Sequence, residues 1–151
     1  MRHGTSAWLT GVHLDHQRPL NELGKVEPAY IASQLIDISW RPELAIVSDA
    51  RRTTQTWQVM AKKLPEATAR YRHELYHAGP EAFEREVGGL ESSVQTILVL
   101  GHNPGWEAVV DKLADVTIRM APAHAALLVG AGETWWDALA GHWRLERVLE
   151  P

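Results

Sequence analysis

The sequence predicts a single α/β domain in which helices cover both faces of a mostly parallel sheet. Short apolar runs rich in branched residues alternate with helical patterns, which is typical of such three-layer folds. A length of 151 residues suits one hydrophobic core, and no linker, repeat or low-complexity stretch divides the chain. We therefore expect one three-layer sandwich over residues 1–151.

The clearest predicted strands are two apolar runs, 44–48 and 94–100. Both are short and rich in branched side chains, as expected for strands that are buried on both faces. A weaker strand is predicted over 69–75. A late pair is predicted over 125–129 and 143–149, with turn signals at 130–134 between them.

Helical spacing of apolar residues predicts helices between these strands. Asn21 is a favourable N-cap for the first helix, Pro65 ends the second, and Pro104 suits the first turn of the last. The expected helices are 21–38, 51–64, 81–87 and 104–114.

Composition argues against several classes of protein. The absence of cysteine excludes a disulfide framework, a thiolate zinc site and a cysteine nucleophile. The net charge of −4 argues against broad nucleic-acid binding, which usually needs a basic face. No apolar run approaches the roughly 18 residues that span a bilayer, and no signal-peptide core follows the N-terminus. We expect a cytoplasmic protein that binds neither nucleic acid nor membrane, while its oligomeric state stays open.

Three short segments carry side chains suited to phosphate chemistry, namely 2–4, 48–56 and 101–105. Each supplies a cation or a histidine where a strand gives way to the next element. In parallel sheets, ligands bind outside the carboxyl ends of the strands. The second and third segments also begin helices, whose free N–H groups attract anions.

Brought together, Arg2, His3, His102 and either Arg51 or Arg52 would form a compact positive cluster. Guanidinium groups match the geometry of phosphoryl oxygens. Neighbouring cations disfavour the imidazolium form, which keeps a histidine neutral and nucleophilic near neutral pH. The cluster therefore predicts a site that both binds phosphate and activates a histidine.

These segments, in this order, resemble the histidine phosphatase superfamily, whose fold is also called phosphoglycerate mutase-like. Its Arg-His-Gly hallmark is matched by 2–4, and its Gly-His-x-Pro pattern is matched by 101–104. Its Ser-Pro-x-x-Arg-x-x-Gln-Thr segment is matched by 48–56, with Asp49 where proline is usual. This match assigns the second arginine of the site to Arg52.

Two further segments, 15–24 and 74–78, are similar to the SixA branch of small phosphohistidine phosphatases. The resemblance spans residues 1 to about 130. It implies a metal-independent phosphatase without a cofactor, in which one histidine becomes a transient phosphohistidine.

The resemblance also implies roles for single residues. His3 would attack phosphorus, and the phosphoryl oxygens would be held by Arg2, Arg52 and His102. Glu74 is a candidate for the acid that protonates the leaving group. Arg18 is a candidate phosphate contact at the rim and, equally, a surface arginine beside Pro19.

Other histidines leave alternatives open. His13, Asp15 and His16 have a spacing that can bind a metal, but no distant motif completes the set, so we expect a loop and no metal site there. His77 and His124 would approach the phosphate pocket only if their loops do.

One departure from the family concerns the N-terminus. Relatives have a short apolar strand before Arg-His-Gly, in the middle of the sheet, whereas here Met1 directly precedes Arg2. Without that strand, two neighbouring strands would face a gap with unpaired backbone groups. We expect either further residues upstream of Met1 in the natural chain or a substitute strand.

The leading hypothesis is a phosphohistidine phosphatase that acts on a phosphorylated protein, because no long insertion is available to build a lid over a small substrate. The second is a phosphatase for small phosphate monoesters. A third, from a different class, is a non-catalytic phosphate-binding module. A mutase is less expected, since it needs a closed pocket that retains its intermediate.

Overall fold

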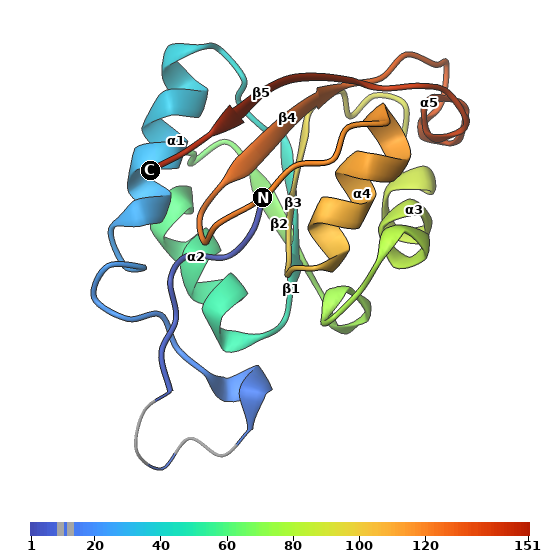
Figure 1. The fold of residues 1–151 in the computed structure, drawn as a ribbon. Coiled ribbons are helices and arrows are strands. Elements are labelled where there is room, and N and C mark those ends of the chain that lie inside the picture. Colours follow the sequence, from blue (N-terminus) through green and yellow to red (C-terminus); the bar gives the residue numbers. More distant parts are fainter. Residues whose placement is uncertain (9–10, 12–13) are drawn as a thin grey trace.

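Within the described residues, the β-structure consists of three parallel strands and an antiparallel pair (Figure 1). The computed structural model describes residues 1–8, 11 and 14–151. In the parallel sheet, β1 (Leu44–Ser48) lies between β2 (Thr68–Arg72) and β3 (Ile97–Leu100). Beside it, β4 (Ala125–Val129) pairs antiparallel with β5 (Arg144–Leu149).

Helices cover the two faces of this β-structure, as predicted. On one side α1 packs against α2, and on the other α3 contacts both α4 and α5 (Figure 1). Their bounds are Glu27–Asp37 for α1, Arg51–Ala61 for α2, Pro80–Gly88 for α3, Gly105–Ala114 for α4 and Trp135–Ala140 for α5, with short 3₁₀ helices η1 (Asp15–Gln17) and η2 (His73–Leu75). None of the helices in the described residues is both long and apolar enough to cross a bilayer.

Strand β1 buries both of its faces, which explains its continuous apolar sequence. Ala45 and Val47 belong to a core cluster with Trp57 of α2, whereas Ile46 belongs to a second cluster with Val110 of α4. Successive side chains of a strand point to opposite faces. The two clusters therefore form the two interfaces of a three-layer α/β sandwich, and the predicted fold class is confirmed.

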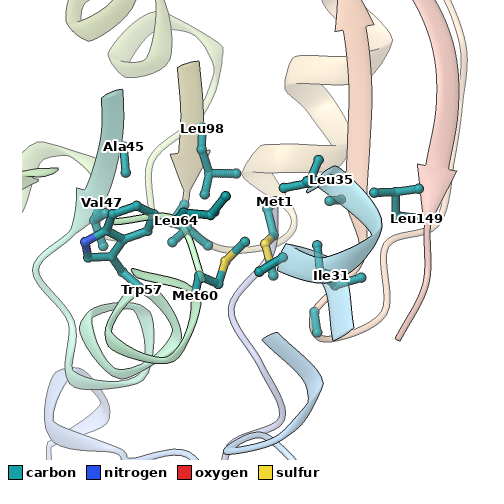
Figure 2. Packing of buried hydrophobic residues seen from close by; sticks show 14 of the residues in the cluster. Met1, Ile31, Leu35, Ala45, Val47, Trp57, Met60, Leu64, Leu98 and Leu149 are labelled. Carbon is teal, nitrogen blue, oxygen red and sulfur yellow. The ribbon is translucent and has the colours of Figure 1, made fainter. Parts of the chain in front are cut away.

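Residues 1–3 join the two sheets at one end. The Gly101 N–H donates to the Met1 carbonyl (3.1 Å), the His3 N–H donates to the Gly101 carbonyl (3.2 Å), and the Arg2 N–H donates to the His124 carbonyl (3.0 Å). The Met1 side chain is buried in the first core cluster, close to Ile31 of α1 (Figure 2). This short segment fixes His3 beside the carboxyl end of β3.

Next to residues 1–3, strands β3 and β4 line a largely apolar cavity of about 390 Å³. No strand from residues 1–8, 11 and 14–151 fills the space between them. The expected substitute strand is therefore not found in these ranges. The alternative, residues upstream of Met1, stays a prediction.

Helix α1 begins at Glu27, six residues later than predicted. The Asn21 side chain does accept a hydrogen bond from the Gly24 N–H (2.8 Å), but it caps a run of turns and not the helix. Gly24 packs so closely on Thr5 that a Cβ atom would lie 2.0 Å from the Thr5 carbonyl oxygen. The chain therefore contacts the segment after His3 before it becomes helical.

The outer strands are shorter than predicted. Strand β2 ends at Arg72, because the next residues turn into η2 and bury Leu75. Strand β3 begins at Ile97, because the Glu43 carboxylate accepts the N–H groups of Gln95 and Thr96 (3.1 Å each). The predicted start of α2 and the predicted end of α4 are confirmed, whereas the end of α2, both ends of α3 and the start of α4 differ from the predicted ones by one to three residues.

Helix α5 was not predicted, since its segment was included in the connection between the late strands. Thr134 and Asp137 form a capping box, in which the Thr134 hydroxyl accepts the Asp137 N–H and the Asp137 carboxylate accepts the Thr134 N–H. A Thr-x-x-acid pattern before an apolar run is a helix-start signal. That pattern is visible in the sequence and could have revealed the helix.

Candidate active site

Three segments far apart in the sequence meet at the carboxyl ends of β1 and β3. Ser48 ends β1, α2 begins three residues later, and Gly101 directly follows β3. Arg2 forms a parallel bridge with Gly101, which places His3 next to His102. Their ring centroids are 5.3 Å apart. The two histidines that the sequence singled out are therefore neighbours in space.

Arg52 connects these two histidines. Its Nε–H donates to His3 Nε2 (3.1 Å) and its Nη2 donates to His102 Nδ1 (3.1 Å). Arg52 is 3% exposed, whereas Arg51, one position earlier on α2, is exposed. The structure places Arg52, and not Arg51, in the pocket.

The contacts of His3 define its neutral tautomer. Nδ1 lies 2.7 Å from the Gly4 carbonyl, which can only accept, so Nδ1 carries the proton. Nε2 receives the Arg52 Nε–H, and a guanidinium never accepts, so Nε2 presents a lone pair. Burial lowers the pKa of His3 to about 4, and the charges of Arg52 and Arg2 act in the same direction. Nε2 is thus an unprotonated nitrogen at neutral pH.

His102 adopts the opposite tautomer. Because Nδ1 accepts from Arg52, the proton is on Nε2, which donates to the Ser48 hydroxyl (2.9 Å). Burial and the Arg52 charge hold the pKa of His102 well below its usual range. Ser48 orients this ring, a contact that the sequence analysis did not foresee.

Arg2 adds a second positive charge. Its Nη1 donates to the Met120 carbonyl (2.8 Å), and its charge contributes to the lowered pKa of His3. Its Nε–H is buried and has no hydrogen-bond partner in the described part of the chain. With Arg52, it gives the pocket two cations beside the two neutral imidazoles, and the two guanidinium groups suit an oxyanion.

Asp15 closes the pocket on one side, a role that sequence reasoning missed. Its carboxylate accepts from Arg52 Nη2 (2.9 Å), Arg18 Nη1 (2.9 Å) and the Tyr76 hydroxyl (2.8 Å). Burial alone would raise the pKa of Asp15, but the hydrogen bonds from Tyr76 and Arg18 and the charge of Arg52 outweigh it and keep the pKa far below its usual range. Asp15 therefore stays ionised and holds the two arginines together.

Tyr76 and His77 lie on the same side of the pocket as Asp15. Their rings are 4.1 Å apart, the Tyr76 ring meets His102 edge-on at 5.5 Å, and His77 Nε2 lies 3.3 Å from the Asp15 carboxylate. His77 thus approaches the pocket. The ring of His124 instead lies 4.0 Å from the Glu150 carboxylate.

The remaining sequence candidates are placed differently. Arg18 reaches the rim, where it pairs with Asp15, donates to the Ser6 hydroxyl (3.0 Å) and lies 4.7 Å from the Trp8 ring centroid.

Glu74 is exposed on η2 and makes no hydrogen bond or ion pair within residues 1–8, 11 and 14–151. Its role as the acid stays a prediction. His13, weighed above as a metal ligand, lies outside the described residues.

No protein-family model matches the chain. An uncharacterized chloroplastic protein of Arabidopsis thaliana is 30% identical over 165 residues, which cover all of this chain and 76% of that protein. A solved structure from Nakamurella multipartita, named as a phosphohistidine phosphatase SixA, superimposes with a TM-score of 0.89 at 26% identity and covers 100% of this chain and 93% of its own. Another so named, from Agrobacterium tumefaciens, gives 0.83 at 28% identity, with 100% and 95% covered.

Proposed function

The chain belongs to the histidine phosphatase superfamily, and from this premise we propose that it is a phosphohistidine phosphatase that removes phosphate from a phosphorylated protein through a covalent intermediate on His3. One observation carries the proposal. A single buried guanidinium, that of Arg52, donates to the nucleophile candidate and to the second histidine at 3.1 Å each. A phosphoryl group drawn to Arg52 is thereby brought to the lone pair of His3.

In the first step, His3 Nε2 attacks phosphorus opposite the leaving group. The new N–P bond forms as the bond to the substrate nitrogen breaks, and the leaving nitrogen takes the electron pair and a proton. Arg2 and Arg52 donate to the phosphoryl oxygens, where charge is greatest in the transition state. His102 would join them only with a proton on Nδ1, because in the resting tautomer Nδ1 accepts from Arg52 and the Nε2–H donates to Ser48. The positive charge that this step needs is supplied by the chain's own side chains.

In the second step, water attacks the phosphohistidine. A P–O bond forms as the P–N bond to His3 breaks, the attacking water releases a proton to solvent, and inorganic phosphate leaves while Nε2 regains its lone pair. The Nδ1–H bond to the Gly4 carbonyl keeps the ring in one orientation throughout both steps. The nucleophile therefore returns to its starting tautomer without rotating.

Proton supply favours a P–N substrate over an ester. An alkoxide leaving group needs an acid, yet Asp15 has a strongly lowered pKa and Glu74 makes no contact with the pocket residues through hydrogen bonds or ion pairs in the described ranges. Phosphohistidine has a more labile leaving group and needs no strong acid. Its nitrogen can also take a proton from solvent.

A protein substrate is supported by the two short connections that follow β1 and β3. Only two residues separate β1 from α2, and four separate β3 from α4, so neither connection builds a lid. The solved relatives from Nakamurella multipartita and Agrobacterium tumefaciens, which carry the name phosphohistidine phosphatase, point to the same substrate class. A side chain presented by another protein suits such a site.

A substrate panel tests this proposal. The wild type and His3→Ala are assayed in parallel on a histidine-phosphorylated protein and on sugar phosphates. We expect the wild type to prefer the phosphoprotein and His3→Ala to lose turnover on both. A preference for sugar phosphates would indicate a small-ester phosphatase, and phosphate binding without turnover would indicate a binding module. Either result would contradict the proposal.

A further inference from the structure

A second cluster of titratable side chains lies beside the phosphate pocket. The Asp49 carboxylate accepts from two imidazoles, with Oδ1 2.7 Å from His16 Nε2 and Oδ2 3.0 Å from His73 Nδ1. The three potential ligand atoms all lie within 4.8 Å of one another. None of these three residues takes part in the proposed phosphatase reaction.

Each of the three residues comes from a different segment, and the backbone holds all three. Asp49 directly follows β1, and its N–H donates to the carbonyl of Arg72 at the end of β2 (3.2 Å). His73 is the next residue after β2 and begins η2, while His16 is the middle residue of η1. The folded chain therefore presents the three side chains together before any ligand arrives.

The chemistry of the set matches a transition-metal ion. Two imidazole nitrogens and one carboxylate are ligands that Zn²⁺ takes in proteins, at about 2.0–2.2 Å each, with further positions for water. Tetrahedral coordination at these lengths separates neighbouring ligand atoms by about 3.3 Å. From 2.7 and 3.0 Å, the two Asp49–histidine contacts need to open by about 0.6 and 0.3 Å. The nitrogens of His16 and His73, at most 4.8 Å apart, need to approach each other, and the His73 side chain, 73% exposed, has room to rotate.

We propose that His16, Asp49 and His73 form a surface site for Zn²⁺. The ion takes the place of the two protons through which the imidazoles are hydrogen-bonded to Asp49. Because the His73 side chain is exposed, water can fill the remaining coordination positions of the ion. The site ties η1 to the ends of β1 and β2. Since η1 also carries Asp15, which contacts Arg52 and Arg18, a bound ion would hold one wall of the phosphate pocket in place.

Calorimetric titration of the metal-free full chain with Zn²⁺ tests the site, with Co²⁺ absorption as a second probe of the ligand set. We expect one ion per chain in the wild type and at least a tenfold loss of affinity in His73→Gln and in Asp49→Asn. His142→Gln, an exposed histidine elsewhere, is the matched control and should bind like the wild type.

The phosphate pocket holds histidines of its own, so His3→Gln is included to separate the two locations. The proposal predicts that His3→Gln keeps the site. Binding that is lost in His3→Gln but unchanged in His73→Gln, or no binding to the wild type, would overturn it. If Asp49→Asn fails to fold, the exposed His73→Gln decides the question alone.

Thermal unfolding gives an independent readout, because a ligand that binds only the folded state stabilises it. Saturating Zn²⁺ should raise the Tm of the wild type and of His142→Gln, and leave that of His73→Gln unchanged. An equal rise in all three proteins would contradict the assigned ligands.

Discussion

At the scale of single residues, the site depends on neutral imidazoles held against permanent cations. His3 and His102 have opposite tautomers because one nitrogen of each ring faces the same guanidinium. Their remaining nitrogens are fixed by the Gly4 carbonyl and the Ser48 hydroxyl. One arginine therefore sets which nitrogen carries a lone pair on both rings.

The planar fork of Arg52 is a feature that lysine cannot reproduce. We expect Arg52→Lys to lower kcat/KM by about 100-fold or more, because an ammonium cannot contact both histidines, Asp15 and a phosphoryl oxygen in a fixed geometry. Arg51→Lys, the exposed neighbour on α2, is the control and should stay within about twofold of the wild type. An equal loss of kcat/KM in the two variants, measured in steady-state assays, would show that the Arg52 guanidinium is not required for the reaction.

The titration of His3 provides a second prediction at this scale. Burial lowers the pKa of His3 to about 4, so nitrogen NMR should show the ring neutral from pH 8 down to about 5 and protonated only near pH 4. An unfolded chain takes up that proton near the usual value of about 6.5. Stability should therefore fall as pH drops from about 6.5 to 4, and be unaffected by this group above 6.5. Titration of folded His3 near 6.5 would contradict the assignment.

At the scale of elements, the site depends on how strand ends and helix starts are joined. Thr56 of α2 shows this: its hydroxyl accepts the Gly4 N–H (3.0 Å) and donates to the Arg52 carbonyl (2.7 Å). It is fully buried. One side chain thus ties the segment that carries His3 to the helix that carries Arg52.

Thr56→Val keeps the shape of the side chain but removes that link. The buried Gly4 N–H would lose its acceptor, which costs about 1–3 kcal/mol of unfolding free energy. Urea unfolding measures the loss. Thr54→Val on the same helix removes only a local bond to the Arg51 carbonyl near solvent, and its effect should stay within about 0.5 kcal/mol. Matching losses in the two variants would refute the coupling.

The sequence predicted those elements whose apolar pattern extends over most of their length. The buried run of β1 matches its prediction, because a parallel strand covered on both faces is apolar over most of its length; only its last residue, Ser48, is polar. The start of α1 was wrong, because the contact between Gly24 and Thr5 is tertiary and leaves no local signal. The sequence indicates Asp15 as a possible metal ligand and as the first residue of the SixA-like segment 15–24, but not as a partner of the pocket arginines, because Arg52 and Tyr76 are distant in the sequence.

At the scale of the whole molecule, the parallel sheet positions the chemistry. Because β1 and β3 run parallel, their carboxyl ends lie at one edge, and each is joined to the next helix by a short connection (Figure 1). The ordered motifs at 2–4, 48–56 and 101–105 could therefore be expected to meet. Their hydrogen bonds could not be predicted, since these depend on how Arg52 is buried among the other groups.

The central claim is that His3 itself carries the phosphoryl group, and trapping that intermediate is the most direct test. The wild type, rapidly mixed with a ³²P-labelled histidine-phosphorylated protein and quenched in alkali, should yield an acid-labile label on the peptide that contains His3. His3→Ala should yield none. Turnover by the wild type with no label on that peptide, or with label on His102, would contradict the account.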